Sequence, residues 1–272
     1  MKVTALIENK SIDDAFHAQH GLSLYIETSS HKMLFDTGQD DAFIKNAEML
    51  GIDLSLVDIA VISHGHYDHG GGLNDFLNLN QKASVYLSKH AFEKHLKMKD
   101  EKTLFIGINQ PESMRRIQLI DQDMRLNDSI QLFTDIDYQP SVIRDEHLYY
   151  EEKGMIKKEI FNHELYLVVQ EHHHQVLFTG CSHKGIEHII DEIERKLHQA
   201  VHSVIGGFHF SHYHQANDIE TAYLQHLGKK MQAAKTNTYY ACHCTGEEAF
   251  NVLEQSMGKK LASLSAGEQI II

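Results

Sequence analysis

Residues 63–72, SHGHYDHGGG, place three histidines and one aspartate within six positions, directly after an apolar run that predicts a buried strand. In an extended segment alternate side chains share a face, so His64 and His66 can bind one ion together. Asp68 and His69 follow where the chain turns toward a helix, and we expect them to bind a second ion beside the first. Imidazole and carboxylate groups are normal zinc ligands, and paired ions are a standard hydrolytic device.

Apolar periodicity predicts strands and helices that alternate along much of the chain. In the first part we expect helices at 41–50 and 73–79 and strands at 2–8, 22–28, 32–36, 57–62 and 83–87. In the last part we expect helices at 186–197, 216–234 and 246–256 and strands at 165–170, 175–179, 201–205, 237–241 and 268–272. A hairpin begins each half, which predicts a four-layer α/β fold with helices outside two sheets.

The middle of the chain lacks this regular pattern. We expect a single domain over 1–272, in which approximately 88–160 form an insert or cap. Within that insert the sequence predicts a helix near 89–99 and short strands at 117–120 and 129–133. Near the C-terminus, Thr245-Gly-Glu-Glu248 has the pattern of a capping box at the start of the last helix.

The composition limits the classes of partner. The 272 residues carry a net charge of −13, which disfavours binding to nucleic acid. No run approaches the roughly 18 apolar residues of a membrane span, and the N-terminus lacks the pattern of a signal peptide. Three cysteines indicate no disulfide framework, so we expect a cytoplasmic protein. A small anionic molecule is the expected substrate, and the oligomeric state, a homo-oligomer included, stays open.

The ordered cluster His64-Gly-His66-Tyr-Asp68-His69 resembles the HxHxDH signature of the metallo-β-lactamase superfamily, as does the lead-in LFDTG at 34–38. This resemblance implies an αββα sandwich. A narrower likeness lies in HGLSLYIET, FNHELYLVV, TGCSHKGI, GGFHF and ACHCTG. Together these segments resemble the branch named for dihydropterin–ribofuranosylaminobenzene phosphate synthase, which also carries an insert in the middle of the fold.

The resemblance implies the remaining ligands. His243 would be the last histidine of the ion held by Asp68 and His69, and His183 would complete the ion held by His64 and His66. In much of the superfamily a bridging aspartate stands where this chain has Cys181. Thiolate is a good zinc ligand, so Cys181 is an alternative to His183, which we favour. Cys242 and Cys244 flank His243 and are expected to pack away from it.

Other side chains near these motifs have less defined roles. His209, in the glycine-loosened GGFHF segment, is the best candidate for a substrate contact or proton donor. Asp36 is better suited to orient a metal-bound histidine than to bind metal itself. His163 is a minor alternative to Cys181 or His183. His20 and Glu164 match positions of the branch, but the sequence assigns them no role.

The resulting hypothesis is a metal-dependent hydrolase that uses Asp68 and His209 on a small phosphoester or related ester. A metal-bound hydroxide would be the nucleophile, and two divalent ions would hold it, with zinc favoured and manganese or iron also compatible. The alternatives are a synthase of the pterin-pathway type and a metal-binding sensor without catalysis. The insert also carries Arg115, Arg116, Lys157 and Lys158, for which a solvated face is the favoured interpretation.

Overall fold

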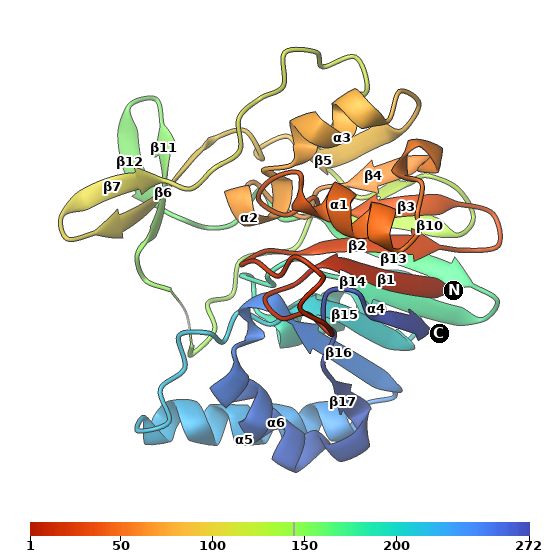
Figure 1. The fold of residues 1–272 in the computed structure, drawn as a ribbon. Helices are drawn as coiled ribbons and strands as arrows, with labels where there is room; N and C mark the ends of the chain where they lie inside the picture. The colour runs from red at the N-terminus through yellow and green to blue at the C-terminus, as the bar shows by residue number, and fades with distance from the viewer. Residues whose placement is uncertain (144) are drawn as a thin grey trace.

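The computed structural model describes residues 1–143 and 145–272. Two seven-stranded sheets lie face to face, and a four-stranded sheet projects from one side of them (Figure 1). Apolar side chains from both large sheets fill the space between them, and the rings of Phe35 and Phe178 meet there with centroids 5.9 Å apart. Helices cover the two outer faces, so the predicted four-layer α/β sandwich is confirmed.

The first large sheet contains the N-terminal hairpin and most of the first half of the chain. Its strands, in spatial order, are β18 (Gln269–Ile271), β1 (Lys2–Ile7), β2 (Ser23–Glu27), β3 (Lys32–Phe35), β4 (Ile59–Val61), β5 (Ser84–Ser88) and β8 (Ile117–Ile120). Strands β1, β2 and β3 pair antiparallel, whereas β3, β4, β5 and β8 are parallel. The carboxyl ends of the parallel strands therefore meet at one edge.

The second large sheet repeats this plan. Its strands, in spatial order, are β17 (Leu261–Ala262), β16 (Thr238–Cys242), β15 (Ser203–Gly207), β14 (His174–Phe178), β13 (Tyr166–Glu171), β10 (Ile130–Phe133) and β9 (Met124–Arg125). The antiparallel strands β9, β10, β13 and β14 lead into the parallel strands β14, β15, β16 and β17. Each half thus begins with a hairpin, as predicted, and continues with parallel strands.

The helices bury apolar stripes on the sheets. Two of them, α1 (Ala42–Met49) and α3 (Leu73–Leu79), pack on the first sheet, and α4 (Ile186–Leu197), α5 (Asp218–Ala233) and α6 (Glu247–Met257) pack on the second. The isoleucines of α4 show why: they recur at helical spacing and all four are buried. Single turns complete the set: η1 (Leu54–Leu56), α2 (Tyr67–Gly70), η2 (His243–Thr245) and η3 (Gly258–Lys260). Among the described residues, no helix is long and apolar enough to span a bilayer.

One predicted helix boundary needs correction. The N-cap of α6 is Gly246, which has no side chain to accept a hydrogen bond, so the predicted capping box with Thr245 as the cap does not form. Thr245 instead belongs to η2, where its hydroxyl donates to the Cys242 carbonyl at 2.9 Å and accepts from the Phe208 amide at 3.1 Å. The threonine therefore ties β16 to the segment after β15.

The region 88–160 supplies all of the small sheet and parts of both large ones. The small sheet has the spatial order β12 (Met155–Lys158), β11 (Leu148–Glu152), β6 (Lys94–Lys99) and β7 (Lys102–Phe105), while β8, β9 and β10 join the sandwich. The predicted helix near 89–99 is wrong. Residues 94–99 form an inner strand paired on both sides, and this tertiary pairing overrides the helical propensity of a Lys-, Leu- and Met-containing segment.

Candidate metal centre

The histidine-rich loop leaves the carboxyl end of β4 and runs into α2. Its ligand-type side chains are almost completely buried, with His64 and His69 at 0% exposure, His66 at 6% and Asp68 at 7%. The loop has no room for a side chain at Gly65, because a Cβ atom there would lie 2.2 Å from the Ala91 carbonyl oxygen. Tight packing therefore fixes the backbone between the first two histidines.

The second large sheet brings single residues to the same place from three successive strands. Cys181 and His183 follow β14, His209 follows β15, and His243 follows β16. These strands are parallel, so their carboxyl ends lie side by side at one sheet edge, as in other α/β ligand sites. Cys181, His183 and His243 are buried, whereas His209 is partly exposed.

His64, His66 and His183 form the first predicted ligand set. His64 Nε2 lies 3.0 Å from His66 Nδ1. One ring nitrogen from each of the three histidines lies within 4.8 Å of a ring nitrogen of the other two. Among the described residues, neither ring nitrogen of His183 has a hydrogen-bond partner, although the residue is only 6% exposed. Buried polar atoms without partners are uncommon in proteins, so these two nitrogens make the residue a candidate ligand.

Asp68, His69 and His243 form the second predicted set. His243 Nε2 lies 3.1 Å from His69 Nε2 and 3.3 Å from Asp68 Oδ2, and the remaining separation, His69 Nε2 to Asp68 Oδ2, is 3.8 Å. Ligand atoms bound 2.0–2.1 Å from a tetrahedral zinc ion lie about 3.3–3.4 Å apart. The spacing of this set therefore fits a divalent metal ion without rearrangement.

Outer hydrogen bonds direct the ring nitrogens of three histidines. His69 Nδ1 donates to Asp36 Oδ2 at 2.7 Å, and His64 Nδ1 donates at 2.9 Å to Ser63 Oγ, whose hydroxyl donates to the same Asp36 carboxylate. His243 Nδ1 donates to Asn9 Oδ1 at 3.0 Å. Each Nε2 atom is thereby left to accept a metal ion, and such outer partners fix both tautomer and ring orientation. Asp36 lies where the sequence predicts it, behind a ligand histidine.

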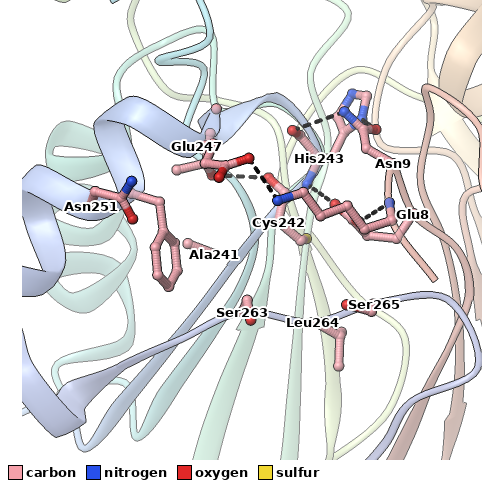
Figure 2. A pocket seen from close by; sticks show the side chains of 14 residues that line it. Glu8, Asn9, Ala241, Cys242, His243, Glu247, Asn251, Ser263, Leu264 and Ser265 are labelled. Atoms are coloured by element: carbon pink, nitrogen blue, oxygen red, sulfur yellow. Dashed lines mark hydrogen bonds and ion pairs between the residues drawn. The ribbon is translucent and has the colours of Figure 1, made fainter. Parts of the chain in front are cut away.

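A cavity of about 300 Å³ lies on the Asn9 side of His243. Figure 2 shows Asn9 beside the His243 ring and Glu8 beside the backbone of that residue. The Glu8 carboxylate accepts from the His243 amide at 2.5 Å. His243 has a left-handed backbone with φ of 50°, a conformation that costs energy in a non-glycine residue and persists where the surroundings enforce it. Glu8 and Asn9 provide that enforcement.

The electrostatics favour metal binding by neutral imidazoles. Burial lowers the pKa of His64, His66 and His183 well below the usual value, so their rings are neutral near pH 7. For His69, burial lowers the pKa, but Asp36 and Asp68 outweigh it and raise the value to about 9. A metal ion with its positive charge would take the place of the proton on that ring.

A cleft of about 250 Å³ opens over both sets. Its walls include His20, His209 and His212 of the sandwich and Lys97 of the small sheet. Asp145, whose side chain is only 3% exposed, accepts from Lys97 at 2.6 Å and pairs with His212 at 3.1 Å. Burial raises the pKa of Asp145, but the hydrogen bonds from His212 and Lys97 outweigh it and hold the pKa well below its usual range. The cleft therefore has a cationic group and a fixed carboxylate at its rim.

The structure adds residues that the sequence left without a role. His20 Nε2 lies 3.1 Å from Asp68 Oδ2 at the mouth of the cleft. Glu164 accepts from the backbone amides of His183 at 2.8 Å and Lys184 at 3.1 Å, which fixes the turn that carries His183. Lys97 was also missed. All three act on partners far along the chain, so spacing gave no local signal.

Three sequence interpretations concern neighbouring side chains. Cys242 packs in the apolar core, as expected, but the expectation for Cys244 is wrong. Residues 243–245 form a helical turn instead of continuing the strand. Cys244 Sγ therefore lies within 4.8 Å of both a His243 ring nitrogen and Cys181 Sγ. His163 Nδ1 accepts from the Gly65 amide at 2.9 Å, which directs that nitrogen to the loop backbone.

The four cations of the middle region do not line the cleft. Arg115 and Arg116 lie at a separate surface cavity. Lys157 pairs with Glu152, and Lys158 lies over the Tyr149 ring at 4.5 Å. The interpretation of both pairs as solvated faces is therefore the better one, and Lys97 is the lysine at the cleft.

Comparisons with known proteins agree with this architecture. The sequence profile of the metallo-beta-lactamase superfamily matches residues 18–226. The crystal structure of Tm1679, a metal-dependent hydrolase of the beta-lactamase superfamily, is similar over 100% of this chain and 99% of that chain, with 30% identity and a TM-score of 0.83. YhfI from Bacillus subtilis shares the fold at 12% identity, with a TM-score of 0.55 over 99% of this chain and 98% of that chain.

Two proteins of Methanocaldococcus jannaschii are similar in sequence. The uncharacterized protein MJ0448 is 29% identical over 93% of this chain and 94% of its own length. The enzyme named 7,8-dihydropterin-6-methyl-4-(beta-D-ribofuranosyl)-aminobenzene-5'-phosphate synthase is 27% identical over 99% of this chain and 96% of its own length. The resemblance first seen in the histidine-rich loop is thus confirmed over most of the sequence and fold, and the chain belongs to the metallo-β-lactamase superfamily.

Proposed function

We propose that this protein is a metal-dependent hydrolase of a small phosphoester or related ester. The observation that carries the proposal is the convergence of two ligand sets, each with residues from both halves of the chain, under a single cleft. We assign His64, His66 and His183 to one divalent ion and Asp68, His69 and His243 to the other. When bound, such ions supply Lewis acidity and make water more acidic.

The side chains around the cleft have complementary tasks. The carboxylate of Asp68 can orient a water molecule and accept its proton, while His20 at 3.1 Å fixes the carboxylate from the solvent side. The His209 ring stands 4.0 Å from the His183 ring, and neither of its nitrogens has a hydrogen-bond partner among the described residues. His209 is therefore positioned to donate a proton to a leaving oxygen.

The small sheet serves as a cap in this proposal. Lys97 and Leu148, from β6 and β11, line the cleft together with residues of the sandwich. Lys97 offers the substrate a positive charge, whereas the chain as a whole carries −13, which selects small anions over polyanions such as nucleic acid. The cleft volume of about 250 Å³ also suits a small molecule.

Zinc is the metal we favour, because nitrogen, carboxylate and adjacent sulfur donors suit it well; manganese and iron are the alternatives. The three cysteines are free and buried, which agrees with the reducing environment of the cytoplasm, where we place the activity.

The likeness to the M. jannaschii synthase supports a second candidate function. In that reaction class an aminobenzoate-type acceptor would join a phosphoribosyl donor, and the same two ligand sets would serve departure of the pyrophosphate. Incubation of the protein with phosphoribosyl pyrophosphate alone distinguishes the hydrolase from the synthase. A hydrolase would cleave this donor without an aromatic acceptor, whereas a synthase would require the acceptor.

The decisive experiment combines metal analysis with turnover. We expect about two equivalents of zinc in the protein and cleavage of a phosphodiester such as bis(p-nitrophenyl) phosphate. His209→Gln should retain both ions and lose most turnover. Full metal occupancy with turnover of neither ester nor phosphoribosyl donor, with or without 4-aminobenzoate, would support a metal-binding sensor and contradict both enzymatic functions.

A further inference from the structure

Cys181 occupies a distinctive place between the two ligand sets. Its Sγ atom lies 3.2 Å from His69 Nε2. The same atom lies within 4.8 Å of a ring nitrogen of His64, of His183 and of His243. The residue is 3% exposed. One sulfur atom is therefore within reach of nitrogens that we assign to different ions.

The turn that carries this cysteine is held rigidly. Ser182 has a left-handed backbone with φ of 59°, and its hydroxyl donates to the Gly207 carbonyl at 2.6 Å. A side chain at Gly180 would meet Ser63, since a Cβ atom there would lie 2.1 Å from Ser63 Oγ. The turn therefore has little freedom to move the Cys181 sulfur away from the histidines.

Cys242 provides an internal contrast. It is as well buried as Cys181, at 5% exposure, but it belongs to the apolar core between the sheets. That is the usual environment of a cysteine that only fills space. Cys181 belongs to no such core cluster among the described residues, and its sulfur instead lies within 4.8 Å of a ring nitrogen of each of four histidines: His64, His69, His183 and His243.

We propose that Cys181 is a thiolate ligand shared by the two ions, in addition to His183 and not instead of it. A zinc–sulfur bond is about 2.3 Å, so a sulfur and a nitrogen on one tetrahedral ion lie about 3.6 Å apart, close to the observed separation from His69. The inference rests on the two ligand sets of the proposed function but requires no hydrolysis. A shared thiolate favours soft ions such as zinc over magnesium or manganese.

Cobalt substitution tests this assignment by a readout other than activity. With Co²⁺ in place of zinc, a coordinated thiolate gives an intense sulfur-to-cobalt charge-transfer band in the near ultraviolet. We expect this band in the unmodified protein and in Cys242→Ala, and its loss in Cys181→Ser. We also expect zinc affinity to fall about 10–100-fold or more in Cys181→Ala.

Two further variants separate coordination from packing. Cys181→Asp replaces the thiolate by a carboxylate. This variant should therefore bind two ions, unlike Cys181→Ala, but should lack the charge-transfer band. Cys244→Ala removes the neighbouring sulfur and should leave the band in place. A band that persists in Cys181→Ser, or one that disappears only in Cys244→Ala, would overturn the proposal.

The outcomes also remain separable from those of the proposed function. A charge-transfer band that depends on Cys181, in a protein that cleaves no ester, would leave the ligand assignment standing and remove the hydrolase. Ester cleavage by a protein whose Co²⁺ form lacks the band would support the hydrolase and overturn the assignment of Cys181 as a ligand.

Discussion

The two large sheets follow one plan but supply the metal centre in different ways. The first sheet delivers four ligand-type side chains from a single loop after β4. The second sheet delivers its ligands one or two at a time, after β14 and β16. The relative positions of the loop side chains depend on neighbouring residues, chiefly on the backbone around Gly65. Geometry in the second sheet depends on the register of its parallel strands, and therefore on the whole sandwich.

This difference would give the candidate metal centre, when occupied, a structural role. The contact of His69 with His243, at 3.1 Å, joins residues 174 positions apart and crosses from one sheet to the other. An ion bound to both would link the two sheets, and a ligand that binds only the folded state stabilises that state. The loop of the first sheet can prepare its four side chains alone, but in this assignment each ion also needs a histidine of the second sheet, His183 for one and His243 for the other.

The largest effect is expected from removing one ligand on each side of this link. His69→Ala and His243→Ala should each lower zinc affinity at the second ion by more than about 100-fold, because ligand loss exceeds the effect of losing an outer partner. Metal analysis of the purified variants would show about one ion instead of two. His173→Ala, in an exposed turn, is the matched control and should retain both ions. Equal metal content in all three variants would show that neither His69 nor His243 holds an ion.

A smaller effect is expected from residues that hydrogen-bond to the candidate ligand histidines. Asp36→Asn should weaken zinc binding by about 10–100-fold, because the carboxylate orients His69 directly and His64 through Ser63. Asn9→Ala should cost less, since the neutral amide makes a weaker hydrogen bond to His243 than a charged carboxylate makes to His69. Competition with a chromogenic chelator measures both. A larger loss in Asn9→Ala would mean that the second sheet's ligand is the less well supported of the two.

The same contrast explains what the sequence could predict. The loop ligands are contiguous, so a short pattern revealed them, and alternating apolar periods revealed both sheets. His183 and His243 stand alone, and only a family resemblance singled them out; their ligand roles stay proposals. Cys244 was misplaced because a helical turn replaces the extended backbone after β16.

The residues at the rim of the cleft were beyond such reasoning. Lys97 lies on a segment whose helical propensity was overridden by strand pairing, and its partner Asp145 is 48 residues away. Contacts of this kind depend on how the small sheet lies against the sandwich, which no local pattern encodes.

A moderate effect is expected at the seam between the two sheets. Gly180→Ala places a methyl group 2.1 Å from Ser63 Oγ and 3.0 Å from His64 Nδ1, so either the second sheet's turn or the first sheet's loop must shift. Overpacking of this kind typically costs about 1–3 kcal/mol, and chemical denaturation would measure the loss. The backbone of Gly180 lies outside the left-handed region, so backbone strain adds nothing to this loss. A Gly180→Ala variant as stable as the unmodified protein would show that the seam between the sheets can open without cost.

The smallest effect is expected from the small sheet, which in the proposed function would contact the substrate without holding the metal. Lys97→Ala should raise KM by up to about fivefold and leave kcat nearly unchanged, because a partly exposed charge contributes at most about 1 kcal/mol to binding. Steady-state kinetics on an anionic ester would measure this split. Lys94→Ala lies on the same strand, pairs with Glu151 on the exposed side, and should leave both constants unchanged. A fall in kcat for Lys97→Ala would instead show that the cap acts on the reacting group, and it would make the small sheet a third contributor to the chemistry beside the two large ones.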